Sequence, residues 1–391
     1  MRVSEWKETQ RGGVLRLSAA ITWEDQDRPD ATLWFEWSAD LADSVRAEPD
    51  AALIATYPLA MFSGEQRLHV AGHISSRLAD GVESAMAVIA EQWPAYRPVR
   101  LELTHGTLPV RERGREAGVC FSGGVDALAA VQQNIRTSSV GDRERFTSAL
   151  FIFGLNTYDF VDGAPSAERL AAYDAHAGRL EAFANATGMA LLRCTTNLRA
   201  LYPSFDAWFA VANTSYLAAT GHLMRPRLAS LALGSSGTGR VAGVTPPPLI
   251  DPLYSTDTLQ VYGAQVMTTR IEKVRRLADW PEGLAVLRVC LLIEMPEGGT
   301  LNCGQCDKCV RTMLELLALG DDALARAPFP ATDVSAELAQ NAMRTPYGRA
   351  FCAELVPLFA ARGRNDLAVA LSNIPAPRAE APQPWWRLRG R

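Results

Sequence analysis

The stretch Gly118-Val-Cys-Phe-Ser-Gly-Gly-Val-Asp-Ala127 decides the fold. Its first four residues are small or apolar and are typical of a buried strand. The two adjacent glycines allow a tight backbone turn that leaves N–H groups bare. A helix predicted over 125–135 directs its positive end at the same place. The stretch therefore predicts a strand, an anion-binding turn and a helix in direct succession.

Strands and helices alternate after this unit, which predicts a parallel sheet covered by helices on both faces. Ligands of such sheets bind beyond the carboxyl ends of the strands. Further strands are expected at 149–153, 189–194 and 228–233, and helices at 166–187 and 205–224.

The flanking regions have different patterns, and three domains follow. Residues 1–112 predict an N-terminal α+β accessory domain, with strands at 14–17 and 32–37 and helices near 42–60 and 73–93. Residues 113–285 form the α/β domain. Residues 286–391 combine cysteines with helical segments at 310–319, 337–344, 351–361 and 367–371, and end in an extended, weakly basic tail over 375–391.

Composition limits the class of protein. The 391 residues contain 39 Lys and Arg against 43 Asp and Glu, a net charge of −4, and 48% are hydrophobic. These values exclude wholesale disorder and supply no general positive field for nucleic acid, so direct nucleic-acid binding is not expected. The charged start has no apolar core, and the charge-free run over 207–224 contains several polar residues, so neither a signal peptide nor a membrane span is expected. We expect a cytoplasmic protein.

Four of the seven cysteines form a motif. Cys290, Cys303, Cys306 and Cys309 supply four thiolates, the set that structural zinc prefers in a closed tetrahedral site. An iron–sulfur cluster also takes four thiolates, and spacing does not separate the two. Lys308 and Arg311 offset the negative charge of such a site. The remaining cysteines are isolated, and the five histidines form no motif.

The glycine turn has the features of a phosphate cradle. It lacks the lysine of the Walker loop and the spacing of the dinucleotide fingerprint. Ser122 adds a hydroxyl donor, and Asp126 can hold a metal ion or order a cation. The alternative is a plain strand-to-helix turn that needs glycine. The expected ATP-binding residues are Phe121, Ser122, Gly123, Gly124, Val125, Asp126 and Ala127.

A basic helix is the second candidate for phosphate chemistry. Arg270 and Lys273 are three residues apart and share one helical face. With Asp126 they are the expected catalytic residues, because cations there could neutralise the charge that develops on a leaving pyrophosphate. The alternative is a solvated basic surface.

Polar residues that follow the strands are candidates for substrate binding. Asn156 and Asn197 follow the second and third strands of the α/β domain. A proline-rich loop over 245–257 follows the fourth strand and offers Asp251, Ser255 and Asp257 as contacts in a rigid wall. A simple connecting loop is the alternative for this segment.

The sequence Ser-Gly-Gly-x-Asp between a strand and a helix resembles the pyrophosphate loop of the N-type ATP pyrophosphatases, which have an adenine nucleotide alpha hydrolase-like (PP-loop) fold. The resemblance implies cleavage of ATP to AMP and pyrophosphate, with Mg²⁺, and adenylation of a carboxylate or carbonyl oxygen. The motif of the family ends in Asp-Ser, whereas this chain has Asp126-Ala127 and lacks one hydroxyl.

The loop and the four cysteines together resemble the 7-cyano-7-deazaguanine synthase family, QueC, over about residues 115–320. The longer chain looks like the divergent QueC-like branch of bacterial antiphage defence, which includes QatC-like proteins and the QueC-like component of CBASS. This resemblance favours zinc over an iron–sulfur cluster. In that branch a deazaguanine carboxylate is joined to the amino terminus of a partner protein.

The expected function is ATP-dependent adenylation of 7-carboxy-7-deazaguanine, or a close carboxylate, followed by amide formation with an amine. The additional N-terminal domain favours a protein amine, because a protein substrate needs a docking surface. Ammonia would instead make the chain a 7-cyano-7-deazaguanine (preQ0) synthase. A non-catalytic nucleotide-binding module and a purely structural interaction protein are the alternatives of another class. A tRNA sulfur transferase is disfavoured by the net charge and the lone Cys194.

Overall fold

The computed structural model describes residues 1–104, 114–156, 159–161, 163–202, 208, 211–235, 248–290, 301–331 and 333–374. The basic tail over 375–391, the start of the proline-rich loop and part of the helix expected over 205–224 lie outside these residues. The expected domain boundary at residue 112 also lies outside them.

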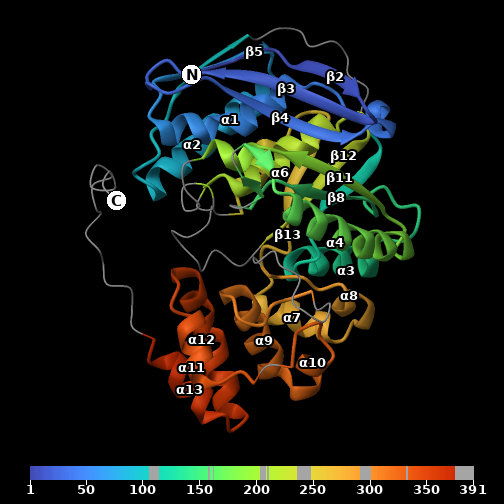
Figure 1. Ribbon diagram of the computed structural model, residues 1–391, viewed down its shortest axis with the longest axis vertical. Helices are drawn as coiled ribbons and strands as arrows, with labels where there is room; N and C mark the ends of the chain where they lie inside the picture. Colours follow the sequence, from blue (N-terminus) through green and yellow to red (C-terminus); the bar gives the residue numbers. More distant parts are fainter. Residues whose placement is uncertain are drawn as a thin grey trace.

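One mixed sheet of eleven strands forms the centre of the protein (Figure 1). Five neighbouring strands are all parallel, in the order β13, β12, β7, β8, β11. Their bounds are Gln260–Ala264 for β13, Leu228–Gly234 for β12, Glu116–Cys120 for β7, Phe146–Phe153 for β8 and Ala190–Thr196 for β11.

The N-terminal strands continue the same sheet. β4 pairs antiparallel with β11, where Thr195 lies opposite Glu36 and Thr196 opposite Phe35. The order beyond β4 is β3, β1, β5, β6, with β2 paired to β3. The bounds are Arg2–Val3 for β1, Lys7–Arg11 for β2, Val14–Thr22 for β3, Ala31–Ser38 for β4, Arg67–His73 for β5 and Arg100–Thr104 for β6.

Two separate cores lie on the two faces of the parallel strands. Neighbouring residues of β8 enter opposite cores, Ala149 and Phe151 on one face and Leu150 on the other, as the alternation of a strand requires. The face of Leu150 is covered by α1 (Pro49–Ser63), α2 (Ser76–Gln92) and α6 (Asn213–Leu223). The opposite face is covered by α3 (Val125–Thr137), α4 (Ala167–Ala186), α7 (Arg270–Ala278) and α8 (Pro281–Ala285).

A helical region follows at the C-terminal end, drawn in orange and red in Figure 1. It has its own core, formed mainly by the first helix and the last three. Its helices are α9 (Asp307–Leu319), α10 (Asp321–Ala325), α11 (Ala336–Ala342), α12 (Pro346–Ala361) and α13 (Asn365–Ser372).

Smaller elements complete the description. A two-stranded ribbon joins β9 (Phe160–Val161) to β10 (Ala164–Pro165), and short 3₁₀ helices occupy Ala39–Ser44, Leu198–Leu201 and Asp251–Tyr254. Among the described residues, no helix combines the length and the apolar character that crossing a membrane requires.

The predicted α/β class, with a mostly parallel sheet between helices, is confirmed. The helix predicted near 42–60 is confirmed as α1, which begins and ends a few residues later than expected. The chain forms a 3₁₀ helix that ends at Ser44, and α1 then begins at Pro49, because proline is favoured at the first position of a helix. Strand β13 was not predicted.

Candidate functional site

The glycine turn lies at the point where the order of the parallel strands reverses. From β7 the chain proceeds outward through β8 and β11, and β12 and β13 then return on the other side of β7. The connections that follow β7 and β12 therefore run in opposite directions along the sheet. Such a reversal leaves a crevice at the carboxyl end of β7. The turn at 121–124 follows β7 directly and leads into α3.

The backbone of the turn needs glycine. Gly123 has a φ of +74°, and a Cβ there would lie 3.0 Å from the carbonyl oxygen of Val286 and 3.2 Å from the ring of His176. Any side chain would meet both conformational strain and a crowded neighbour. Gly124 is the N-cap residue of α3, so the first N–H groups of this helix face the crevice.

His176 of α4 supports the turn from below. Its Nε2 lies 3.0 Å from the carbonyl oxygen of Ser122. Because a carbonyl oxygen only accepts, the Nε2 atom carries the proton and donates it. Burial lowers the pKa of His176 to about 4, so the imidazole is neutral at neutral pH. No motif in the sequence identifies this histidine, because its partner is a backbone atom distant in the chain.

Asp126, Arg270 and Lys273, the three expected catalytic residues, lie in contact with one another. The carboxylate of Asp126 accepts from Arg270 at 3.0 Å and from Lys273 at 3.2 Å. Lys273 also donates to the carbonyl oxygen of Ser235. Burial lowers the pKa of Lys273, and the charge of Asp126 counteracts part of this change. The two cations come from α7, and both are buried.

Arg270 connects this cluster to the C-terminal region. Its guanidinium also donates to Glu315 at 3.1 Å and to the hydroxyl of Thr312 at 3.3 Å, both on α9. One buried arginine therefore joins the first turn of α3 to the helix that carries the last cysteine of the motif. This link depends on bonds between charged groups, which are stronger than neutral ones.

A cavity of about 400 Å³ opens above the turn. Its wall contains five cationic side chains and two carboxylates, so it suits an anion. The cations are Arg169, Arg270, Arg288, Lys308 and Arg311, and the carboxylates are Asp126 and Asp159. All the expected ATP-binding residues except Gly123 line it, namely Phe121, Ser122, Gly124, Val125, Asp126 and Ala127.

One wall of the cavity is aromatic and comes from β8 and α4. Phe151 stacks on Tyr173 with ring centroids 4.3 Å apart. Asp159 and Arg169 form a buried ion pair at 3.2 Å beside this wall, and Asp159 also accepts from the backbone N–H of Asn156 at 2.9 Å. Asn156 is thus the one expected substrate residue that the structure brings to the cavity.

The other four expected substrate residues do not line this cavity. The side-chain amide of Asn197 is bonded to the backbone of β4, at Trp34 and Thr32. The hydroxyl of Ser255 closes its own loop on Val261.

Asp251 and Asp257 have contrasting surroundings. Asp251 is buried, and burial raises the pKa of its carboxyl to about 7. Its Oδ1 atom has no hydrogen-bond partner in the described part of the chain. Asp257 is exposed to solvent.

The four cysteines converge on one point. Each offers a sulfur, and all four sulfurs lie within 4.8 Å of one another. The sulfurs of Cys303 and Cys309 are 3.8 Å apart. A tetrahedral zinc–thiolate site with bonds of about 2.3 Å has sulfur–sulfur distances of about 3.8 Å, so the cluster fits Zn²⁺ with little adjustment.

The ligand loop has the local structure of a thiolate site. Gly304 has a φ of +71°, which lets the chain fold back, and the N–H groups of Gln305 and Cys306 point at the sulfur of Cys303 at 3.4 and 3.3 Å. Cys306 is the N-cap residue of α9, and Cys309 lies in its first turn. The positive end of this helix stabilises thiolates.

Asn302 holds the two halves of the cysteine cluster together. Its side-chain oxygen accepts from the N–H groups of Val289 and Cys290, at 2.8 and 3.2 Å. Its nitrogen donates to the carbonyl oxygens of Leu287 and Pro328, at 2.9 and 3.0 Å. Sequence analysis did not identify this asparagine. The available signal was its position directly before Cys303, where a polar side chain can orient the ligand loop.

The cysteine cluster and the cavity share a border. Arg288 precedes Cys290 by two positions, Lys308 lies between two ligands, and Arg311 follows Cys309 by two positions. All three line the cavity. The sequence predicted Lys308 and Arg311 only as counter-charges for thiolates and did not single out Arg288. Their positions within two residues of a cysteine were the one available signal.

Neither a family model, a curated protein nor a solved structure matches this chain. The geometry of the site therefore carries the functional argument.

Proposed function

We propose that the protein is an AMP- and pyrophosphate-forming ligase of the cytoplasm, which adenylates a carboxylate and passes the acyl group to an amine. One observation carries this proposal: a glycine turn at the reversal point of a parallel sheet opens into a cavity that holds five cations. Bare N–H groups, a helix N-terminus and arginine side chains are the groups that bind polyphosphates.

The reaction has two steps. A carboxylate oxygen of the acid attacks the α-phosphorus of ATP, the bond to the bridging oxygen of the β-phosphate breaks, and pyrophosphate leaves. An uncharged amine then attacks the carbonyl carbon of the acyl adenylate. AMP leaves, the nitrogen loses a proton to solvent or a base, and an amide remains.

The residues around the turn have distinct tasks in this scheme. The turn and the start of α3 receive the phosphates that leave, where negative charge develops. Arg270, which lines the cavity, adds positive charge. Lys273 does not line it and instead fixes Asp126 from behind, so we assign it a positioning role. Mg²⁺ accompanies ATP and reduces repulsion between the phosphates.

The four cysteines hold a structural zinc ion in this proposal. Four thiolates leave no open ligand position, so the metal contributes to folding and not to bond making. The convergence of the sulfurs and their N–H donors supports such a site.

The nature of the acid and of the amine rests on the likeness of both motifs to QueC-like proteins. We propose 7-carboxy-7-deazaguanine as the acid and the amino terminus of a partner protein in an antiphage system as the amine. A cavity of about 400 Å³ with an aromatic wall supports a flat acid beside ATP. Use of ammonia would make the same chain a preQ0 synthase.

The test is to incubate the protein with ATP, Mg²⁺ and 7-carboxy-7-deazaguanine, with and without the products of neighbouring genes. We expect AMP and pyrophosphate, and a partner whose mass increases by one deazaguanine acyl group. Release of ADP, or AMP formation that needs no carboxylate, would contradict the proposal. A nitrile product without a modified protein would identify the ammonia-dependent reaction.

A second candidate is a nucleotide-binding module without turnover. It is favoured by Ala127, which lines the cavity at the position where the pyrophosphatase loop has a serine. Tight ATP binding with no isotope exchange between pyrophosphate and ATP, at any carboxylate concentration, would support this candidate.

A further inference from the structure

The cations of the cavity form two groups that have different charged neighbours. On what we call the Asp126 side, the electrostatic neighbours of Lys308 are Arg311, Arg270 and Asp126. On the Asp159 side, those of Arg288 are the sulfurs of Cys290 and Cys309 together with Arg169 and Asp159. The two groups belong to different elements. The residues of the Asp126 side come from α3, α7 and α9. Those of the Asp159 side come from α4, from the segment before α4 and from the segment before Cys290.

Arg288 is the arginine on the Asp159 side that forms no ion pair with a carboxylate of the described residues. Arg169 and Asp159 form an ion pair with each other, which cancels their charges locally. Among the described residues no hydrogen bond or ion pair reaches the guanidinium of Arg288, and its Nε atom is buried without a partner. A half-buried arginine that has lost water contacts and gains no hydrogen bond from the described residues is suited to an anionic ligand.

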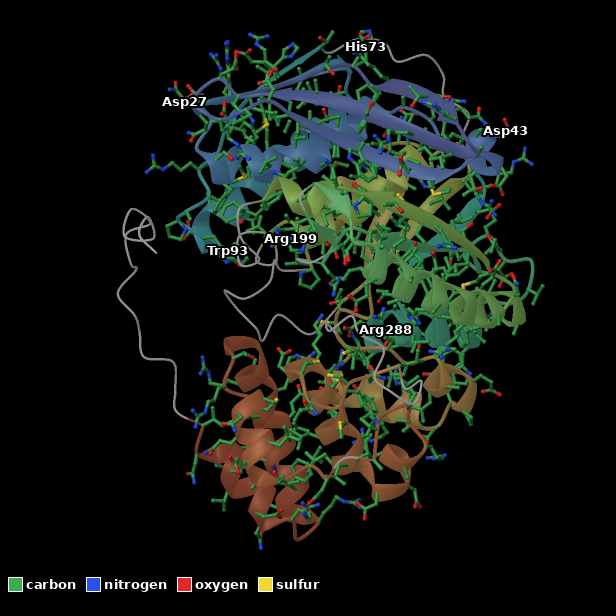
Figure 2. The ribbon with its side chains drawn as sticks, in the orientation of Figure 1. Asp27, Asp43, His73, Trp93, Arg199 and Arg288 are labelled. Carbon is green, nitrogen blue, oxygen red and sulfur yellow. The ribbon has the colours of Figure 1, made fainter. Side chains whose placement is uncertain are left out.

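The backbone fixes where this arginine lies. The N–H of Arg288 donates to the carbonyl oxygen of Gly123 at 2.9 Å, so residue 288 is attached to the turn itself. Figure 2 shows Arg288 at the junction of the sheet layer with the C-terminal helices. The stacked pair of Phe151 and Tyr173 lines the same cavity, and Tyr173 lies one helical turn from Arg169 in α4.

An adenylating enzyme must bring two anions into contact. The carboxylate has to approach the α-phosphate from the side opposite the departing pyrophosphate, and the two negative charges repel each other. A second cation, separate from those that bind the leaving phosphates, offsets this repulsion. The planar guanidinium suits a carboxylate because it can donate two parallel hydrogen bonds.

We propose that the Asp159 side is the acid subsite, in which Arg288 binds the carboxylate of the acyl substrate and the Phe151–Tyr173 wall receives its flat ring. The Asp126 side then holds the β- and γ-phosphates. This inference rests on the proposed function and assigns a substrate class, an aromatic carboxylate, to one defined part of the cavity.

The experiment compares wild type with Arg288→Ala, Arg288→Lys and the control Arg275→Ala, which changes an exposed arginine of α7. ATP affinity is measured by calorimetry, the KM for 7-carboxy-7-deazaguanine by isotope exchange between pyrophosphate and ATP, and bound metal by elemental analysis. For Arg288→Ala we expect the KM for the acid to rise about 10- to 100-fold, the loss typical of a charged hydrogen bond. ATP affinity should change by no more than about twofold, because in this proposal the side chain of Arg288 contacts no phosphate.

The conservative variant keeps the inference testable if the alanine variant does not fold. Arg288→Lys retains the charge but cannot donate two parallel hydrogen bonds to a carboxylate. We therefore expect a KM for the acid between those of wild type and Arg288→Ala, with ATP affinity unchanged. Arg275→Ala should match wild type in every measurement.

Four results would overturn the inference. Weaker ATP binding with an unchanged KM for the acid would assign Arg288 to a phosphate. Loss of bound zinc as the main effect would assign it to the charge of the thiolates. If Arg288→Ala catalyses isotope exchange between pyrophosphate and ATP with an unaltered KM for the acid, the subsite is rejected and the proposed function remains. A wild-type protein that binds no ATP would reject both.

Discussion

Asp126 is the residue on which two buried cations depend. Arg270 and Lys273 expose 4% and 1% of their side chains, and both bind this carboxylate. Asp126→Ala should therefore abolish ATP turnover and also lower the free energy of unfolding by about 3 kcal/mol, because buried charge is left without its partner. The sequence does not predict this cost in stability, because it does not reveal how deeply the two cations are buried.

The measurements are pyrophosphate release and denaturant unfolding. Asp80→Ala, on the exposed face of α2, is the control and should change neither. A stability of Asp126→Ala equal to that of wild type would show that Glu315 and Ser235 alone satisfy the two cations.

His176 makes stability depend on pH. Its pKa falls from 6.5 to about 4 on folding, so the folded protein binds this proton less readily than the unfolded chain. Its contribution is complete above pH 6.5 and is lost as the pH falls from there toward 4, with a maximum of about 3 kcal/mol. Burial also lowers the pKa of His222, which changes stability in the same direction.

Unfolding by urea between pH 4 and 8 measures this dependence. His176→Gln retains a donor for the carbonyl oxygen of Ser122 but does not titrate. We expect the acid-induced loss to be smaller in this variant than in wild type. Identical pH profiles would mean that the proton of His176 does not contribute.

At the scale of single elements, the segment before α9 organises the metal site. Asn302 makes four hydrogen bonds that hold Cys290 next to the loop of Cys303. Asn302→Ala should reduce zinc affinity by about 10- to 100-fold, as is typical for residues that orient metal ligands. Competition with a coloured chelator measures this affinity. The control is Asn341→Ala, an exposed position of α11.

Loss of zinc should have a local effect first. Because α9 carries Lys308 and Arg311 to the cavity, removal of the metal should weaken ATP binding while the N-terminal strands stay protected from hydrogen exchange. Retention of full ATP affinity by the metal-free protein would separate the two sites. Iron in place of zinc in the purified protein would identify the four-cysteine site as an iron–sulfur site.

Elements with a strong local pattern were predictable from the sequence. The turn at 121–124, strand β8 and helix α4 follow from apolar runs and glycine, whose effects act within a few residues. Strand β13 was missed because Gln260–Ala264 is short and gains its stability from pairing with β12. Arg288 was missed for a similar reason, since its position is set by a bond to Gly123 that no sequence pattern reports.

At the scale of the whole molecule, we expect the N-terminal strands and the strands around the glycine turn to unfold as one cooperative unit. A buried ion cluster joins them: Arg225, which follows α6, binds Asp50 at 2.6 Å and Glu48 at 2.5 Å at the start of α1. Arg225→Ala should cost about 3 to 5 kcal/mol, because two buried carboxylates lose their partner.

Hydrogen exchange tests the size of this unit. In Arg225→Ala we expect β3 and β7 to exchange faster together, although they lie on opposite sides of the junction between β4 and β11. Faster exchange confined to α1 would show two independent units. Arg143→Ala, at an exposed site, serves as the control.

The antiparallel pairing of β4 with β11 also determines how long β4 remains without this partner while the chain is being synthesised. The bond between Trp34 and Asn197 spans 163 positions of the chain. At about 5 to 20 residues per second, the ribosome needs roughly 8 to 30 s to deliver the partner of β4 after β4 itself has emerged. For that interval the strand presents an open edge with apolar residues on it, which is the kind of surface that joins other chains. The nascent protein is therefore most exposed to aggregation before β11 has been made, and slower translation of residues 39–189 would lengthen that period.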